Sequence, residues 1–291
     1  MESRELLSKI TALPLIAGGL AEDLLAGNFS SIFKGQGIEV DEVRHYERGD
    51  EVRSIDWNVS ARFGTPFVKM YREERDLTVF LVLDSSASMG SAGASARVPY
   101  EQGILAAALI AFSAEQAGQR VGAVFFDREI SRVFPPRKGR AQVMAILTGA
   151  LRHGAKGRGS SLGAALLGAG RLLKRRSLVV VVSDFLALNW EKELGALCRK
   201  HDVIALRVGL PPDEEMPGLG LITLEDPESG RTLQGTTNFA PFRAAWAEWK
   251  GERARSWRVV CRRSGVASLD LSATEDIPAA LIRFFGGRRR L

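Results

Sequence analysis

Two apolar segments, Leu77–Leu83 and Leu178–Ser183, constrain the possible folds of this chain more than any other part of its sequence. Both are rich in β-branched or aromatic residues, and each runs directly into a carboxylate, Asp84 or Asp184. Runs of this kind are typical of strands that are buried on both faces of a parallel sheet covered by helices. Helical patterns separate the apolar runs after residue 76, so the sequence predicts an α/β fold with a mostly parallel central sheet.

The same patterns predict the other elements and a change of organisation near residue 76. Further strands are expected at Val121–Phe126, Ile130–Phe134, Val203–Val208, Leu221–Leu224 and Arg231–Gln234. Helices are expected at Glu2–Leu25, Pro99–Ala117, Arg140–Leu151, Leu162–Lys174, Trp190–Lys200, Ala240–Ala254 and Ile277–Phe285. The segment Glu39–Asp76 is instead dense in charges and interrupted by Gly and Pro. We therefore expect an irregular N-terminal extension, helical and charged, over residues 1–76 and an α/β domain over residues 77–291.

The composition is that of an ordinary globular chain, and it argues against several classes of protein. The formal net charge is +6 and the pI is near 9.6, but the basic residues are scattered and no RNA-binding or zinc-finger signature accompanies them. The longest uncharged apolar stretch, Ile104–Phe112, is far shorter than the roughly 20 residues of a membrane span. We therefore expect a cytoplasmic protein with no membrane span and no nucleic-acid partner, whose Cys198 and Cys261 are free thiols.

The residues that follow the first apolar run have a pattern suited to metal binding. Asp84, Ser86 and Ser88 stand at alternate positions. Ligands in open α/β sheets gather at the carboxyl ends of the strands, where these side chains would lie. A carboxylate and two hydroxyls are hard oxygen donors, which suit Mg²⁺ or Mn²⁺ and suit zinc poorly. The sequence therefore predicts a divalent-metal site at this end of the strand.

Two more segments supply candidate ligands at the same edge of the sheet. Asp184 follows the other apolar strand, and Ser160 or Ser161 precedes a helical pattern as an N-cap. The combined set holds two carboxylates and three hydroxyls, few enough charges to leave an octahedral Mg²⁺ with waters and one exchangeable position. An ion held in this way can accept a carboxylate from a partner.

This arrangement resembles the metal-ion-dependent adhesion site of the von Willebrand factor A-like fold, which has the pattern Asp-x-Ser-x-Ser, then a distant Thr, then a distant Asp. The resemblance implies that Asp84, Ser86 and Ser88 form the first loop and that Asp184 contacts the metal, often through water. It also implies that Ser160 takes the place of the usual Thr. Ser160 keeps the hydroxyl and lacks the methyl group, and the adjacent Ser161 is an alternative ligand.

The charged segment Val40–Arg75 looks like the signature of a bacterial family called domain of unknown function 58, and the similarity extends over roughly residues 30–190. Members of that family resemble partners of MoxR-type AAA+ ATPases and are associated with chaperone-like or assembly roles. The resemblance therefore implies that this chain has a MoxR-type AAA+ ATPase, its client, or both as partners.

The charges of this segment have two readings. They alternate in sign, so they are expected either to pair locally or to be displayed to a partner. The partner-binding candidates on the second reading are Arg48, Asp50, Arg53, Asp56 and Trp57. Trp57 is either a docking aromatic, since Trp and Arg are enriched at interface hot spots, or an anchor that packs the segment on the sheet. We favour the anchor.

A hydrolase is one enzymatic alternative. Gly159–Gly163 fits the Gly-x-Ser-x-Gly nucleophile elbow, and Ser161, Asp184 and His201 follow the order of nucleophile, acid and base. The elbow requires a strand directly before the Ser, however, and His153–Arg158 is rich in Gly and charge.

The other enzymatic alternative is magnesium-dependent phosphotransfer through Asp84, because Mg²⁺ and a carboxylate at a strand end suit phosphoryl chemistry. The position of the usual second acid is occupied by Ser86. No Gly-x-x-x-x-Gly-Lys-Ser/Thr loop occurs, so any ATP hydrolysis must belong to a partner.

The sequence as a whole favours a divalent-metal-dependent protein-interaction module, not an enzyme. A strand-end ion, Mg²⁺ or Mn²⁺, would complete its coordination with an acidic side chain of a protein partner. The alternative without metal is a scaffold that binds through residues 39–76.

Overall fold

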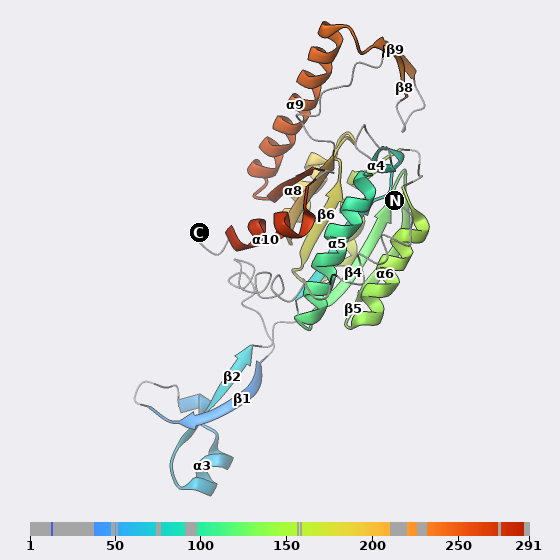
Figure 1. Ribbon diagram of the computed structural model, residues 1–291. Helices are drawn as coiled ribbons and strands as arrows, with labels where there is room; N and C mark the ends of the chain where they lie inside the picture. Colours follow the sequence, from blue (N-terminus) through green and yellow to red (C-terminus); the bar gives the residue numbers. More distant parts are fainter. Residues whose placement is uncertain are drawn as a thin grey trace. The chain divides into compact units, whose positions relative to one another are not determined.

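A computed structural model of the chain describes residues 13, 38–47, 50, 52–73, 77–90, 98–155, 157, 159–209, 220–225, 232–272 and 275–287. The chain divides into two compact units, Ser31–Asp76 and a larger one of Met1–Ser30 with Leu77–Leu291 (Figure 1). The expected helix Glu2–Leu25 lies outside the described residues, apart from Leu13, which is helical and buried. The predicted two-domain organisation with a boundary at residue 76 stays a prediction.

The larger unit is built around a six-stranded sheet with the order β10-β7-β6-β3-β4-β5. Neighbouring strands are parallel except for β5, which is antiparallel to β4. The strands are β3 (Thr78–Asp84), β4 (Arg120–Phe126), β5 (Ile130–Arg137), β6 (Leu178–Ser183), β7 (Asp202–Gly209) and β10 (Ala267–Ser272). The two apolar runs form β3 and β6, which pair with each other at the centre of the sheet.

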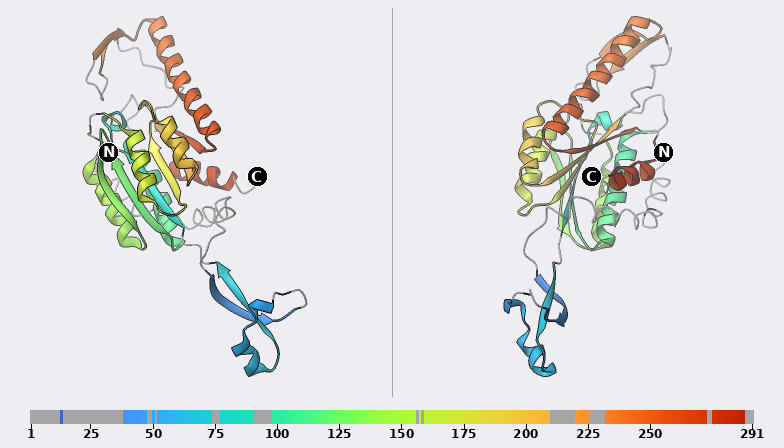
Figure 2. Two further views of the ribbon diagram at one scale, coloured as in Figure 1. Left: turned by 180° about the vertical axis from the view of Figure 1, so that it is seen from behind. Right: turned by 90° about the vertical axis from the view of Figure 1, so that its left-hand side faces the viewer.

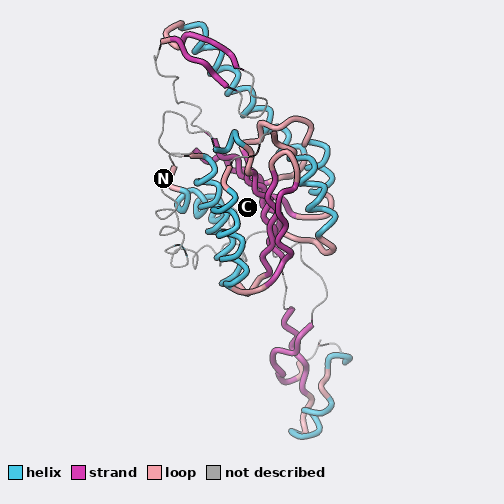
Figure 3. Tube along the Cα trace, turned by 90° about the vertical axis from the view of Figure 1, so that its right-hand side faces the viewer, coloured by secondary structure: helices cyan, strands magenta, loops and turns pink. Residues whose placement is uncertain are grey.

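Helices cover both faces of this sheet and give three layers (Figures 2 and 3). The helices α5, α6 and α10 lie on one face, and α7, α8 and the C-terminal half of α9 lie on the other. Their bounds are α5 (Pro99–Gln116), α6 (Arg140–His153), α7 (Leu162–Leu172), α8 (Glu191–Cys198), α9 (Ala240–Arg263) and α10 (Ile277–Gly287), with a short α4 (Ala87–Gly90) after β3. This is the von Willebrand factor A-like α/β architecture that the sequence predicts.

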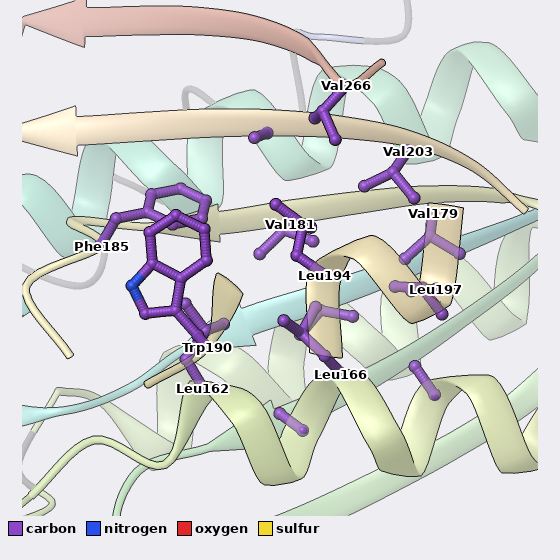
Figure 4. Close-up of a cluster of buried hydrophobic side chains, with 14 of the residues drawn as sticks. Leu162, Leu166, Val179, Val181, Phe185, Trp190, Leu194, Leu197, Val203 and Val266 are labelled. Atoms are coloured by element: carbon purple, nitrogen blue, oxygen red, sulfur yellow. The ribbon is translucent and has the colours of Figure 1, made fainter. Parts of the chain in front are cut away.

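The core explains why the central strands read as continuous apolar runs. Both faces of β3 and β6 are covered, and every residue of β6 is buried. On one face the alternate residues of these strands pack against α7 and α8 (Figure 4). The same cluster includes residues of α9. Members of this cluster include Phe80, Val82, Val179, Val181, Leu162, Leu166, Leu194, Leu197, Trp257 and Cys261. Each large side chain buried in this way stabilises the fold by about 1.5–3 kcal/mol.

Two elements of the larger unit differ from the expectations. The helix predicted to end at Ala254 continues to Arg263, and the edge strand β10 was not predicted. The polar pair of strands forms a separate two-stranded antiparallel sheet of β8 (Leu221–Glu225) and β9 (Thr232–Thr236). No helix among the described residues is long and apolar enough to cross a membrane, and Cys198 and Cys261 are free.

The smaller unit corrects the expectation of an irregular charged extension. It contains two antiparallel strands, β1 (Ile38–His45) and β2 (Phe67–Glu73), with a bulge between Val40 and Glu42. A 3-10 helix (Val52–Ser54) and α3 (Trp57–Phe63) connect these strands. The alternation of apolar and charged residues over Ile38–Asp41 indicates a strand, but it is short and the bulge interrupts it.

His201 is the basis of a prediction about acid stability. Its side chain is 3% exposed, and neither ring nitrogen has a hydrogen-bond partner among the described residues. Burial, reinforced by Lys200, lowers the pKa of His201 below its ordinary value of 6.5. The unfolded chain therefore takes up a proton below about pH 6.5 that the folded chain excludes, and this contribution to stability is lost as the pH falls.

We expect His201→Leu to remove that contribution. The melting temperature of the wild type, measured from pH 8 down to pH 5, should drop relative to that of the variant as the pH falls. If the difference between them stays constant over this range, His201 is not titrating with a lowered pKa.

Candidate functional site

The candidate site lies where the strand order reverses. From β3 the chain proceeds to β4 and β5 on one side, and later to β6, β7 and β10 on the other. The carboxyl ends of β3 and β6 therefore form a topological switch point, the usual place for a ligand in an open α/β sheet. Asp84 ends β3, and Asp184 directly follows β6.

Asp84 is held by hydrogen bonds to both of its carboxylate oxygens. Its side chain is 2% exposed. The Ser183 hydroxyl donates to Oδ2 at 2.6 Å, and the Ser160 hydroxyl donates to the same oxygen at 3.3 Å. The backbone N–H of Ser86 donates to Oδ1 at 2.9 Å. The orientation of Asp84 is thus fixed by three separate segments of the chain.

The second carboxylate, Asp184, contacts the same loop. It accepts a hydrogen bond from the Ser88 hydroxyl, whose oxygen lies 3.1 Å from that of Ser86. The backbone N–H of Leu186 donates to Asp184 Oδ1 at 3.0 Å. The structure therefore brings together all five predicted residues, with Ser160 and not Ser161 in contact with Asp84.

The turn after Asp184 contains an unusual backbone conformation. Phe185 has a φ of +56°, a region that costs a non-glycine residue on the order of 1–3 kcal/mol. Its ring is buried edge-to-face against Trp190 at 5.2 Å and packs on Trp257 at 5.6 Å (Figure 4). The aromatic contacts thus hold the strained turn that follows Asp184.

The segment that carries Ser160 is fastened to the first loop at Gly157. Gly157 forms a parallel bridge with Ser86, and its carbonyl accepts a hydrogen bond from the N–H of Ala87 at 2.7 Å. A Cβ atom at Gly157 would overlap the carboxyl group of Asp127. The carbonyl of Asp127 accepts a hydrogen bond from the N–H of Ser161 at 2.7 Å. Asp127 and Gly157 therefore position the Ser160 hydroxyl.

The electrostatics of the site oppose a second negative charge. Burial, then the neighbouring Asp184, raises the pKa of Asp84 from 3.8 to about 7. Burial also raises the pKa of Asp184, although hydrogen bonds from Ser88 and Leu186 and the charge of Arg207 partly counter this. A carboxylate whose pKa is raised by burial and by a second carboxylate beside it forms a place where a cation would be stabilised.

The donor set fits a hard divalent cation. It combines two carboxylates with the hydroxyls of Ser86, Ser88 and Ser160, all oxygen donors of the kind that Mg²⁺ and Mn²⁺ prefer. The described part of the chain holds no group of three or more His, Cys, Asp or Glu that could bind a metal. Here the hydroxyls complete the set.

The predicted hydrolase residues are not brought together. Asp184 follows the carboxyl end of β6, whereas His201 directly precedes the amino end of the parallel strand β7. The two residues therefore lie at opposite ends of these neighbouring strands. A six-residue strand separates its ends by about 20 Å. Ser161 is preceded by a loop and not by a strand.

The partner-binding candidates lie in the smaller unit, described by itself. Asp50 pairs with Arg44 at 2.7 Å, and the backbone N–H of Glu47 and the Arg44 guanidinium lower the pKa of Asp50. Asp56 caps α3 by accepting from the N–H groups of Asn58 and Val59. Both residues thus make local contacts, and their contact with a partner stays a prediction.

Within the smaller unit Trp57 is 67% exposed, and the preference for Trp57 as an anchor on the sheet stays a prediction. Val52 and Phe63 are similarly exposed, and α3 buries none of its residues. Arg48 and the side chain of Arg53 lie outside the described part of the chain.

Comparisons with known proteins give a family and a fold. The family described as Protein of unknown function DUF58 matches residues 42–256. An uncharacterized protein of Mycobacterium tuberculosis is 31% identical over 298 residues, which is 100% of this chain and 92% of the relative. One from Mycobacterium avium is 36% identical over 121 residues, 40% of this chain and 69% of that protein.

Two solved structures resemble the fold at low sequence identity. An aerotolerance-related membrane protein from Bacteroides fragilis has a TM-score of 0.50 and 16% identity, over 74% of this chain and 100% of that chain. The conserved hypothetical protein BatB from Bacteroides thetaiotaomicron has a TM-score of 0.49 and 14% identity, with the same coverage.

The raised pKa of Asp84 predicts a gain in stability when its charge is removed. Folded, metal-free protein keeps a proton on Asp84 up to about pH 7, whereas the unfolded chain releases it near 3.8. This contribution is therefore complete below pH 3.8 and is lost as the pH rises through 7. In EDTA at pH 8, Asp84→Asn should melt several degrees above the wild type, and the gap should close towards pH 4. A lower melting point for the variant at pH 8 would contradict the assigned pKa.

The contact between Gly157 and Asp127 predicts a second effect. Gly157→Ala should destabilise the protein by about 1–3 kcal/mol, because the added methyl group overlaps Asp127 and must part the two loops. Gly209→Ala, at the carboxyl end of β7, is the matched control, since its Cβ would meet nothing within 4 Å. Chemical denaturation of both variants measures the effect. Equal stabilities would show that the loops do not depend on this contact.

Proposed function

Because this chain belongs to the DUF58 family, for which no function is known, we propose from the site itself that it is a divalent-cation-dependent protein-binding module. The observation that carries the proposal is the pair of carboxylates, buried Asp84 and half-buried Asp184, held by hydroxyl donors at the switch point of the sheet.

The residues of the site would have different roles in binding the ion. Asp84 and the hydroxyls of Ser86, Ser88 and Ser160 would hold Mg²⁺ or Mn²⁺ directly, and Asp184 would contact it directly or through water. The ion, when bound, supplies a Lewis-acidic position that accepts a partner's carboxylate. The pre-existing hydrogen bonds of Asp84 keep the set in place before the ion arrives, so little ordering is needed on binding.

The partner proposed for this site is a protein that presents an acidic side chain. The family resemblance points to a MoxR-type AAA+ ATPase or its client. The sequence of this chain contains no phosphate-binding loop motif, so ATP hydrolysis would be carried out by that partner. We propose that the chain is not an enzyme. Asp184 and His201 of the hydrolase alternative lie at opposite ends of their parallel strands, and Ser86 occupies the position of the second acid that phosphotransfer usually requires.

A second candidate function has its own support. Val52, Trp57 and Phe63 in the smaller unit are each more than 60% exposed. The exposed Trp57, a residue type enriched at binding hot spots, favours the alternative in which residues 39–76 bind a partner without metal. The two proposals make different predictions for the removal of Mg²⁺.

Calorimetric titration of Mg²⁺ and Mn²⁺ into metal-free protein tests the metal-dependent proposal. The wild type should bind, Asp84→Asn should not, and Ser160→Ala should bind about tenfold more weakly. Ser161→Ala is the matched control because its side chain makes no capping hydrogen bond, and it should bind like the wild type. A glutamate-containing peptide should then bind only in the presence of the metal.

Each result separates the alternatives. Equal binding by the wild type and Asp84→Asn would remove the ion from this site. Partner binding that persists in EDTA and is lost in Trp57→Ala would support the scaffold of residues 39–76 instead.

A further inference from the structure

The helix α9 extends past the sheet on the side of the candidate site. It contains 24 residues, about 36 Å at 1.5 Å per residue, while β10 contains six, about 20 Å. A turn of three residues joins the end of α9 to the start of β10, so the helix runs back along the strands. Its N-terminal half therefore projects beyond their carboxyl ends, the edge that α4 marks in Figures 1 and 2.

Only the C-terminal half of α9 packs in the hydrophobic core. Its buried residues are Ala254, Trp257 and Cys261. The N-terminal half, Ala240–Arg253, buries none and is braced instead by the sheet of β8 and β9, where the ring of Phe242 lies against Gly235. We call this half and the two strands the arm.

The arm is held together at its tip. The N–H of Thr237 donates to the carbonyl of Gly220 at 2.8 Å, and the Arg243 guanidinium donates to the carbonyl of Thr237 at 2.6 Å. An isolated helical segment of this length is marginal in water. These contacts keep the arm ordered at a place where no core supports it.

Between the braced tip and the core, the arm carries an open apolar and cationic face. Trp246 and Trp249 stack with centroids 5.3 Å apart, and the Arg253 guanidinium lies 5.5 Å from the Trp249 ring. Trp249 is 41% exposed. It lines an open cavity of about 260 Å³ together with Glu252, Arg253 and Ser256. Trp and Arg side chains in such a setting are the residues most enriched at binding hot spots.

The charge of α9 indicates which kind of ligand this face would bind. The helix carries seven Lys and Arg residues against two Glu. Arg207 and Arg258, near its C-terminal half, are already paired with Asp270. The surplus positive charge favours an acidic occupant, and the exposed Trp249 favours one that also brings an apolar side chain.

We propose that the arm is a second contact surface for the protein partner of the metal site, and that it binds an acidic segment of that partner. An apolar side chain of the segment packs on Trp249, and a carboxylate pairs with the Arg253 guanidinium. This inference rests on the proposed function for the identity of the partner, because the arm rises from the same edge as Asp84 and Asp184.

A protein segment fits this face better than nucleic acid or an anionic membrane does. Glu252 lines the same cavity as Arg253, and Glu248 lies one turn before it. Fixed carboxylates repel a continuous phosphate surface, whereas a polypeptide can place an uncharged or basic side chain opposite them.

The test uses a fluorescein-labelled peptide of alternating Glu and Leu, titrated with the full-length protein and followed by anisotropy. The double variant Trp249→Ala, Arg253→Gln should bind about tenfold more weakly than the wild type. The double variant Val259→Ala, Arg262→Gln is the matched control, since it removes an exposed apolar residue and an exposed Arg of the same helix outside the cavity. It should bind within about twofold of the wild type. A peptide of alternating Glu and Ser should bind the wild type about tenfold more weakly.

The same titration in EDTA, and with Asp84→Asn, separates the two proposals. One outcome is that the double variant of the arm loses affinity for the peptide in EDTA as well, while Mg²⁺ does not raise the affinity of the wild type. In that case the arm is a binding surface and the metal-dependent proposal fails. The arm proposal is overturned if the Glu–Leu peptide does not bind the wild type, or if both double variants lose affinity equally. It is also overturned if duplex DNA or phosphatidylserine vesicles bind more tightly through Trp249 and Arg253 than the peptide does.

Discussion

The parallel pairing of β3 with β6 is the constraint on which the rest of the larger unit depends. The two strands are separated in sequence by β4, β5 and the helices α4 to α7, so their pairing closes a long loop. The entropy cost of closure grows only slowly with loop length. The burial of nearly every residue of both strands offsets it. The same pairing sets the carboxyl ends of the two strands side by side, and it thereby places Asp84 next to Asp184. One interaction thus serves both the core and the candidate site.

The sequence predicts most of the fold where a segment's own residues determine its structure. Strands buried on both faces are apolar throughout, so β3 and β6 are visible without knowledge of their neighbours. The edge strand β10 alternates Leu with polar residues over only six positions, and pairing with β7 adds to this short pattern. The strands of the smaller unit carry so many charges that their pairing is not visible from composition. Tertiary context, and not local propensity, decides these segments.

In the candidate site, too, some residues can be predicted from the sequence and others cannot. Asp84 and Asp184 are predictable because each follows a strand whose carboxyl end must lie at the sheet edge. The contribution of Ser183 is not, since its hydroxyl reaches Asp84 only through the register of β3 and β6. Asp127 and Gly157 act through a bridge between two loops, and a lone Gly in a Gly-rich loop gives no signal of such a contact. The fold shared with other proteins likewise does not supply the function, which depends on side chains grafted onto it.

The conformation of Phe185 limits what natural variation this site can accept. Its backbone lies in the left-handed region that glycine occupies at least cost, while its side chain fills the space beside Trp190 and Trp257. Glycine would relieve the backbone and leave the aromatic cluster with a void. A β-branched residue would neither fit the backbone nor replace the ring. Few amino acids satisfy both demands, so drift at this position should be slow, and it should be accompanied by changes in the two tryptophans.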